Sequence, residues 1–181
     1  DKADKKIFSQ FKKYKTFIAA STHETEELFA ARTHILLNKK NKNIITIIIP
    51  RHINRVGQII SEISELGLKV VTRSSNKVEL KDIDIFIVDT FGETEKFYKF
   101  ATTVFLGKSI VKGGGQNPLE PARFGAKILH GPGVSNFKDV YKYLKQLKIS
   151  SEVNSPKKCA NSVIFKKNMK KVKKMKYLGS R

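Results

Sequence analysis

The 181-residue sequence lacks tryptophan and contains one cysteine, Cys159. A single cysteine excludes a disulfide within the chain and metal sites built from pairs of cysteines, so a reducing, cytoplasmic environment is expected. Also missing is any apolar run near the ~20 residues that a membrane-spanning helix needs. The longest such run, Ile44 to Ile49, is interrupted by Thr46 and ends at Pro50, which is typical of a buried strand.

Acidic residues are few: 16 Asp and Glu stand against 36 Lys and Arg, a net charge of +20. This imbalance predicts partners that carry phosphate or carboxylate groups, and nucleic acid, nucleotides and anionic membranes all meet that description. Hydrophobic residues make up 40% of the chain, which is enough for the core of one domain.

The first fifteen residues, DKADKKIFSQFKKYK, contain neither an initiator methionine nor the apolar core of a signal peptide. We therefore expect the chain to be a segment of a longer protein. Residues 1–15 are interpreted as a basic lead-in or linker.

Apolar runs and amphipathic stretches alternate from residue 16 to residue 150. Near-continuous apolar runs alternating with helical patterns predict a parallel sheet that is covered on both faces. The fold class expected for residues 16–150 is therefore α/β, a Rossmann-like doubly wound parallel sheet of about six strands. The predicted strands are 16–20, 44–49, 68–72, 83–88, 102–106 and 126–129, and the clearest helices are 56–66, 93–100, 118–124 and 137–147.

The alternation ends after Ser150, and residues 151–181 are expected to form a basic C-terminal loop followed by a helix or tail. Three interpretations remain open: a helix that packs on the domain, a basic helix at a membrane surface, or a frayed tail. The lysine-coated packing helix is the favoured one.

Ligands of doubly wound sheets bind beyond the carboxyl ends of the strands, where the stretch GGGQNPLE spans residues 113–120. Consecutive glycines let the backbone approach a ligand, and the helix start behind them offers free N–H groups suited to phosphate. Pro118 fits a first helical turn, and Glu120 is suited to accept hydrogen bonds from sugar hydroxyls. An ordinary tight connection would also contain glycine, so spacing alone leaves both interpretations open.

Two further loops carry charged residues directly after strands. His23 and Glu24 belong to an acidic cluster at a helix start, where a capping box accounts for carboxylates but not for the histidine. Arg51, His52 and Arg55 could clamp phosphate or carboxylate, although a solvated helix start is the alternative.

The sequence gives little indication of a metal site or of a hydrolase active site. Asp89 and Glu93 alone are a poor signal for a divalent metal, and neither zinc-ligand spacing nor a Ser-His-Asp order is evident.

Several loop motifs, taken together, resemble one family. In order, they are ASTHETEE, IIIPRHINR, RSS at residues 73–75, DTFGETEKFY and GGGQNPLEPARFGAKILHGPGVSNF. Over about Phe17 to Leu147 they resemble the C-terminal domain of the 3-deoxy-D-manno-octulosonic acid (Kdo) transferases of lipopolysaccharide synthesis. The chain departs from the usual pattern at Gln116, where histidine is usual, and at Thr25, where glycine is common. Gln116 cannot carry a proton if that position needs a carrier.

The resemblance implies the C-terminal half of a GT-B glycosyltransferase, in which two Rossmann-like domains face each other across a cleft. This half would bind the donor CMP-Kdo without a metal or other cofactor. An acceptor hydroxyl of a lipid A precursor would attack the anomeric carbon of Kdo while CMP leaves. The acceptor site, the proposed catalytic base and the membrane association belong to the N-terminal domain, so this fragment alone is expected to be soluble and inactive. The parent enzyme is expected at the cytoplasmic face of the bacterial inner membrane, held partly by its basic charge.

The resemblance also assigns donor-binding roles. Gly113 to Gly115 with Asn117 would approach the phosphate and carboxylate of the donor, and Glu120 would hold the ribose hydroxyls. In the loop after the second strand, Arg51 and His52 would contact anionic groups or cytidine. In the loop after the fourth strand, Thr90, Gly92 and Glu93 would form a wall near the base. In the first loop, Ser21, His23 and Glu24 would contact Kdo or the other domain. No residue of this chain is assigned as the catalytic base.

Two other functions compete with this one. A different GT-B enzyme could share the phosphate loop and use a UDP- or GDP-sugar. A nucleic-acid-binding module would fit the charge, but Tyr141, Tyr143 and Phe165 are too few and too scattered for a stacking surface. No nucleic acid partner is therefore expected.

Overall fold

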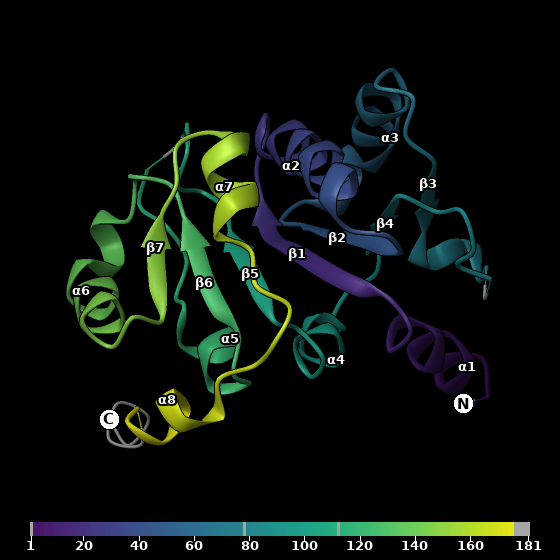
Figure 1. Cartoon of the computed structure of the whole chain (residues 1–181). Coiled ribbons are helices and arrows are strands. Elements are labelled where there is room, and N and C mark those ends of the chain that lie inside the picture. Colours follow the sequence, from purple (N-terminus) through teal and green to yellow (C-terminus); the bar gives the residue numbers. More distant parts are fainter. Residues whose placement is uncertain (1, 78, 112, 176–181) are drawn as a thin grey trace.

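The structure, a computed structural model, describes residues 2–77, 79–111 and 113–175. Within these residues all strand pairs are parallel and form one sheet in the order β3-β4-β2-β1-β5-β6-β7 (Figure 1). The strands are β1 (Lys15–Thr22), β2 (Ile44–Pro50), β3 (Val70–Thr72), β4 (Ile85–Ile87), β5 (Thr103–Leu106), β6 (Lys127–His130) and β7 (Ser150–Glu152). The predicted α/β fold with a parallel sheet is confirmed.

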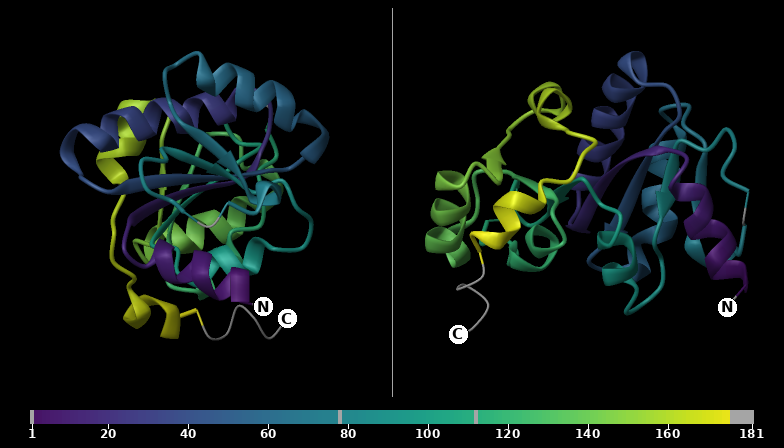
Figure 2. Two further views of the ribbon diagram at one scale, coloured as in Figure 1. Left: turned by 90° about the vertical axis from the view of Figure 1, so that its right-hand side faces the viewer. Right: turned by 60° about the horizontal axis from the view of Figure 1, so that its bottom comes forward.

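Helices cover both faces of the sheet, as the left view of Figure 2 shows. α2, α3 and α7 lie on one face, and α1, α4, α5 and α6 lie on the other. The helices are α1 (Lys2–Phe11), α2 (Glu26–Lys40), α3 (Val56–Ser64), α4 (Thr94–Tyr98), α5 (Leu119–Arg123), α6 (Lys138–Gln146), α7 (Pro156–Ser162) and α8 (Met169–Lys173). Single 3₁₀ turns lie at Ile53–Arg55, Arg73–Ser75 and Ser135–Phe137.

The core consists of two layers, one on each side of the sheet. Because side chains alternate along a strand, Ile18 and Ala20 of β1 face one layer, while Phe17 and Ala19 face the other. All residues of β2 are buried. Strands buried on both faces explain why the sequence shows continuous apolar runs rather than alternation.

Residues 2–11, expected as part of a basic lead-in, form a helix that belongs to the core. Ile7 is 3% exposed and Phe11 1%, and Phe11 stacks on Phe100 with ring centroids 5.3 Å apart. The sequence analysis weighed the six lysines of residues 1–15 and overlooked the apolar pair, which is spaced by four residues as one helical face requires.

Beyond residue 150 the structure adds a seventh strand that the sequence analysis did not predict. β7 pairs with β6, and its residues Ser150 to Glu152 are polar because it lies at the edge of the sheet. α7 then packs against α2 through buried Cys159. From α7 the chain runs past the amino ends of β5 and β6 to α8 (Figure 1). α7 lies in the part of the segment that was expected to be a loop, and α8 contains no buried residue. The packing-helix interpretation of the basic end stays a prediction, and residues 176–181 lie outside the described residues.

The strand order places a topological switch between β1 and β5. The chain moves from β1 to β2 on one side and later returns to start β5 on the other side. Loops that follow β1 and β5 therefore diverge, and such a crevice is where doubly wound sheets bind ligands. We call the side of the sheet where these loops lie the carboxyl edge, and the opposite side the amino edge.

Candidate functional site

A buried carboxylate joins the two loops at the switch. Glu26, the first residue of α2, is 1% exposed and accepts four backbone N–H groups. One carboxylate oxygen accepts from His23 at 2.9 Å and Lys108 at 2.8 Å, and the other accepts from Ser109 and Ile110 at 3.1 Å each. We call this arrangement the Glu26 junction. It fixes the loop after β5 against the start of α2, because a buried carboxylate is stable only when its oxygens are satisfied.

Ser109 extends the junction to the loop after β6. Its side chain is buried, donates to Leu106 O at 2.7 Å and accepts from Gly131 N at 2.9 Å. Its carbonyl oxygen accepts from Gly133 N at 2.8 Å. Three loops, after β1, β5 and β6, are thus held together at the carboxyl edge.

Two of the three glycines in the glycine-rich loop are required by packing and backbone conformation. Gly114 and Gly115 are buried and have φ of 110° and 77°, where side chains are rarely tolerated. A Cβ at Gly115 would lie 3.0 Å from Val134 Cα, so this glycine allows the β6 loop to approach. Gly113 is exposed, and a Cβ there would meet only Gly133 Cα at 3.9 Å. Of the three, Gly113 offers its backbone to solvent.

The polar residues that follow the glycines lie at the start of α5. Asn117 is exposed, and its side-chain oxygen accepts from Leu119 N at 3.0 Å, which forms an Asx turn just before this short helix. Glu120 is exposed in the first turn of α5. Burial of the phenol is the main cause that raises the pKa of Tyr98, and the charge of Glu120 contributes. Gln116 is held through its backbone, since Tyr141 donates its hydroxyl to Gln116 O at 3.0 Å.

Strained backbone gathers at the same edge. Ser21, Thr25 and Lys108 have φ of 54°, 76° and 57°, in the left-handed region that non-glycine residues seldom adopt. Ser21 interrupts the register between β1 and β2, and a Cβ at Gly107 would overlap its carbonyl oxygen. The conformation of Thr25 explains why glycine suits this position, because a β-branched side chain is disfavoured there. Such strain is commonly retained at functional sites.

The loops after β1 and β2 bring two histidines together. The rings of His23 and His52 meet edge to face with centroids 5.5 Å apart. Arg51 N donates to Thr22 O at 3.0 Å, which ties the two loops, while the side chains of Arg51 and His52 are exposed. Glu24 is exposed beside them. Ser21, His23, Glu24, Arg51 and His52 therefore form one group along the carboxyl edge.

Arg55, considered as part of an anion clamp, is already paired. Its guanidinium donates to both carboxylate oxygens of Glu27, at 2.8 and 3.2 Å, and Glu27 is fully buried. This hydrogen bonding, outweighing burial, raises the pKa of Arg55. The pair joins the start of α3 to the start of α2, so its role is to position the loops around Arg51 and His52.

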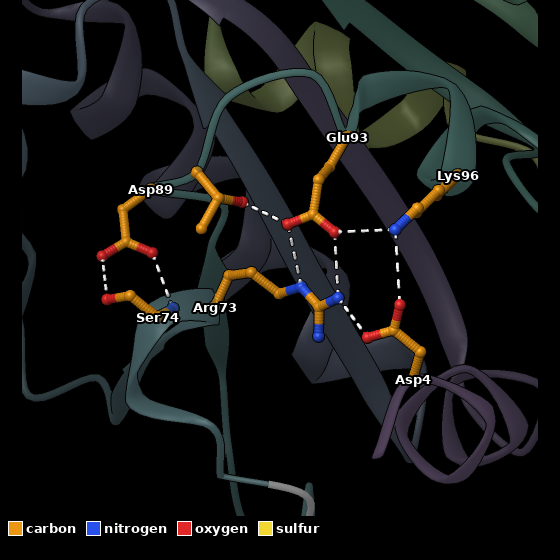
Figure 3. A network of polar contacts seen from close by, with 7 residues as sticks. Asp4, Arg73, Ser74, Asp89, Glu93 and Lys96 are labelled. Carbon is orange, nitrogen blue, oxygen red and sulfur yellow. Dashed lines mark hydrogen bonds and ion pairs between the residues drawn. The ribbon is translucent and has the colours of Figure 1, made fainter. Parts of the chain in front are cut away.

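Thr90 and Glu93 lie in a second polar network, around Arg73 (Figure 3). Arg73 donates to both oxygens of Glu93, at 3.1 and 2.9 Å, and also to Asp4 of α1. Thr90 donates its hydroxyl to Glu93, and Lys96 bridges Glu93 at 3.2 Å and Asp4 at 3.3 Å. The Arg73 hydrogen bond is the main reason that the pKa of Glu93 falls to about 2.

The carboxylate of Glu93 is bonded within the Arg73 network, whereas Phe91 and Gly92 of the same loop face solvent. Gly92, with φ of 72°, and Phe91, 88% exposed, follow Thr90 in the loop after β4. Asp89 accepts from the backbone and the hydroxyl of Ser74, which ties this loop to the one after β3 (Figure 3). Of the residues predicted to form a wall near the base, Thr90 and Glu93 belong to the Arg73 network and Gly92 lies in the loop beside it; their contact with a base stays a prediction.

Sequence reasoning did not assign Glu26, Ser109 or Arg73 to the site, although each organises it. Glu26 was attributed to helix capping, and Ser109 lies in an ordinary apolar context. Arg73 directly follows the predicted strand 68–72, and this position could have identified it as a site residue. Among the residues that the structure describes, no group of three or more His, Cys, Asp and Glu residues could hold a metal ion.

Comparison with known proteins adds sequence and structural relatives, although no family model matches the chain. The chain is 31% identical over 139 residues to a 3-deoxy-D-manno-octulosonic acid transferase of Haemophilus influenzae, covering 77% of this chain and 33% of that protein. It is also 31% identical over 160 residues to the Rickettsia bellii protein of the same name, covering 88% and 38%. By sequence, the chain is a homologue of the Kdo transferases. It spans about a third of the length of these two relatives.

A solved structure supports the same fold. The C-terminal CMP-Kdo binding domain of WaaA from Acinetobacter baumannii superposes with a TM-score of 0.80 at 21% identity, over 88% of this chain and 84% of that one. This match confirms the fold that the Kdo transferase motifs implied. Among the described residues, no helix is both long and apolar enough to span a bilayer.

Proposed function

We propose that this chain is the donor-binding domain of a glycosyltransferase that moves Kdo from CMP-Kdo to a lipid A precursor in lipopolysaccharide core synthesis. One observation carries the proposal: the motifs shared with the Kdo transferases converge on the carboxyl edge, around the Glu26 junction. These motifs come from loops that are far apart in the sequence. Their convergence is what a binding site at a topological switch requires.

The donor contacts follow from exposure. Gly113 and Asn117 present backbone and amide groups for the phosphate and carboxylate of the donor, with Gly114 and Gly115 shaping the loop. Glu120 is an exposed carboxylate in the first turn of α5, directly after this loop, and would accept hydrogen bonds from the ribose hydroxyls. Thr90, Gly92 and Glu93 would form the wall beside the base, with Glu93 acting through Arg73.

Charge stabilisation at the leaving group is assigned to the group beside the switch. Arg51 is exposed and can grip two phosphate oxygens, and His52 and His23 lie next to it. As CMP leaves, positive charge and N–H donors would stabilise its phosphate without a metal. Ser21 and Glu24 lie along the same edge, where Kdo or the other domain would contact them.

The remaining parts of the reaction are assigned to the rest of the parent enzyme. The acceptor hydroxyl, its catalytic base and the second domain would complete the site across the carboxyl edge. The parent would work at the cytoplasmic face of the inner membrane, where anionic lipids attract its basic charge. This fragment is expected to bind the donor without turnover.

Nucleotide selectivity tests the proposal. Thermal unfolding should be followed with CMP, UMP, GMP and AMP at millimolar concentration, for the unaltered chain, Glu120→Ala and the exposed control Glu95→Ala. A ligand that binds only the native state raises stability, so a selective rise of Tm with CMP is expected. Glu120→Ala should lose this rise and Glu95→Ala should retain it.

Other results point elsewhere. A preference for UMP or GMP would indicate a UDP- or GDP-sugar enzyme and overturn the Kdo assignment. Equal responses to all four nucleotides would leave only a phosphate site. Retention of the CMP response by Glu120→Ala would remove the ribose role from Glu120.

A further inference from the structure

A cavity lies at the amino edge, on the opposite side of the sheet from the candidate donor site. It measures about 180 Å³, and its lining residues come from the end of α5, the starts of β6 and β7, and the C-terminal segment that includes α8. Figure 1 shows where these elements lie. Lys127, Lys148, Lys171 and Asn168 line it together with the apolar side chains of Ala122, Ile149, Ile164 and Val172.

The cavity carries positive charge without a counter-charge. Three lysines line it, and none of the described lining residues is acidic. Lys127 and Lys171 are half-buried, and each donates one hydrogen bond to a backbone carbonyl, to Ser162 O at 2.7 Å and to Lys148 O at 2.8 Å. An ammonium group has three donors, so both lysines retain donors for a further partner.

The lysines also disfavour one another. Burial first, and then the charge of Lys171, lowers the pKa of Lys127. A buried cation without a carboxylate partner is costly, and an anion in the cavity would offset that cost for both side chains. None of the described lining residues supplies the negative group that would balance these lysines.

The C-terminal segment is held in place to form this cavity. Asn168 N donates to Gly125 O at 3.2 Å, and Lys167 donates its ammonium to Lys99 O. Gly125 has φ of 94°, and a Cβ there would lie 2.7 Å from Met169 Sδ. The close approach of the segment thus depends on glycine at position 125, and the cavity is a built feature of the fold.

We propose that this cavity binds a phosphate group. Three lysines and an amide suit a phosphate dianion better than a single carboxylate, because lysine binds phosphate as a point charge. The apolar lining accommodates carbon atoms attached to the phosphate. Free phosphate and the headgroup of an anionic phospholipid share this chemistry, and Met169, 53% exposed beside the cavity, could contact acyl chains.

The first experiment measures Tm with inorganic phosphate against chloride at equal ionic strength. The variants are Lys127→Met/Lys171→Met and a control of equal charge, Lys12→Met/Lys142→Met, whose lysines are exposed and away from the cavity. At phosphate well above its Kd, the unaltered chain and the control should gain about 3 °C, and the cavity variant should gain little. The control matters because phosphate also stabilises proteins through exclusion from their surface.

A second experiment identifies the source of the phosphate. Flotation with phosphatidylglycerol vesicles, compared with phosphatidylcholine vesicles, should retain the unaltered chain and the control but not the cavity variant if a lipid headgroup is the ligand. Stabilisation by inorganic phosphate without vesicle binding would identify free phosphate. The absence of both responses, or equal responses from the cavity variant and control, would overturn the proposal.

A milder variant guards against loss of folding. Lys148→Met removes one cation and leaves the hydrogen bonds of Lys127 and Lys171 intact, because their acceptors are backbone carbonyls, Ser162 O and Lys148 O. It should reduce the phosphate response by at least half. An unchanged response in Lys148→Met would contradict the proposal, and the CMP response should be unaffected in either case.

Discussion

The two edges of the sheet expose opposite backbone groups: N–H groups of helix starts at the carboxyl edge, and carbonyl groups of helix ends at the amino edge. At the carboxyl edge the helices begin, and carboxylates accept from backbone N–H groups, as Glu26 and Asp89 do. At the amino edge the carbonyl groups that precede the strands and end the helices are exposed, and lysines donate to them, as Lys127, Lys167 and Lys171 do. Each edge thus attracts the charge that complements its backbone.

The two edges also differ in how their cationic side chains are paired. Arginines near the candidate donor site are largely neutralised, Arg55 by Glu27 and Arg73 by Glu93 and Asp4, which leaves Arg51 exposed there. In the C-terminal segment, Lys167 and Lys171 donate to carbonyl oxygens instead of carboxylates, so these two cations are not neutralised by a paired acid.

The largest effect is expected from Glu26→Ala. It leaves four N–H groups without their acceptor and should lower the free energy of unfolding by about 4 kcal/mol, measured by urea denaturation. Glu24→Ala, on the exposed side of the same loop, should change it by less than about 0.5 kcal/mol. Equal effects of the two variants would show that the Glu26 junction does not organise the carboxyl edge.

A smaller, pH-dependent effect is expected at the Arg73 network. The folded pKa of Glu93, about 2, lies below its ordinary value of 4.5, so its stabilising contribution is complete above about pH 5 and is lost as pH falls toward 2. Glu93→Gln should therefore cost about 2 kcal/mol at pH 7, and the difference from the unaltered chain should shrink below pH 4.5. Glu95→Gln is the exposed control, and a pH-independent difference for Glu93→Gln would argue against the ion pair.

The smallest effect concerns the amino edge. Gly125→Ala should cost about 1 kcal/mol, because its φ is positive and the new Cβ would press on Met169. Adding Met169→Ala should recover the steric part. Gly57→Ala, in α3 with no atom within 4 Å of the new Cβ, should instead stabilise by about 0.5 kcal/mol. If Gly125→Ala were also stabilising, that result would contradict the close packing of the C-terminal segment against residue 125.

Most of the sheet could be predicted from the sequence, for a physical reason. Strands buried on both faces read as apolar runs such as Ile44 to Ile49, and all six predicted strands are present. β7 could not be recognised because an edge strand can be polar, and α1 was obscured by lysines that surround Ile7 and Phe11. Short helices such as α5 gave only approximate boundaries.

The candidate site was predictable as a set of loops but not as a set of contacts. Strand ends located Arg51, His52 and the glycine loop, and similarity to the Kdo transferases supplied their proposed roles. Which carboxylate would be buried could not be read from the sequence, since Glu24, Glu26 and Glu27 are adjacent and chemically alike. Only the three-dimensional arrangement shows that Glu24 faces solvent, Glu26 binds N–H groups and Glu27 holds Arg55.

The Glu26 junction also determines when the site can form. Three of its four bonds connect residues separated by 82 to 84 positions, so the carboxylate of Glu26 gains these partners only once the loop after β5 is in place. Contacts of such sequence separation carry a high entropy of loop closure and are made after local structure. We therefore expect the carboxyl edge to assemble late in folding, after residue 110 has left the ribosome, whereas β1 and β2 are close enough in sequence to pair earlier.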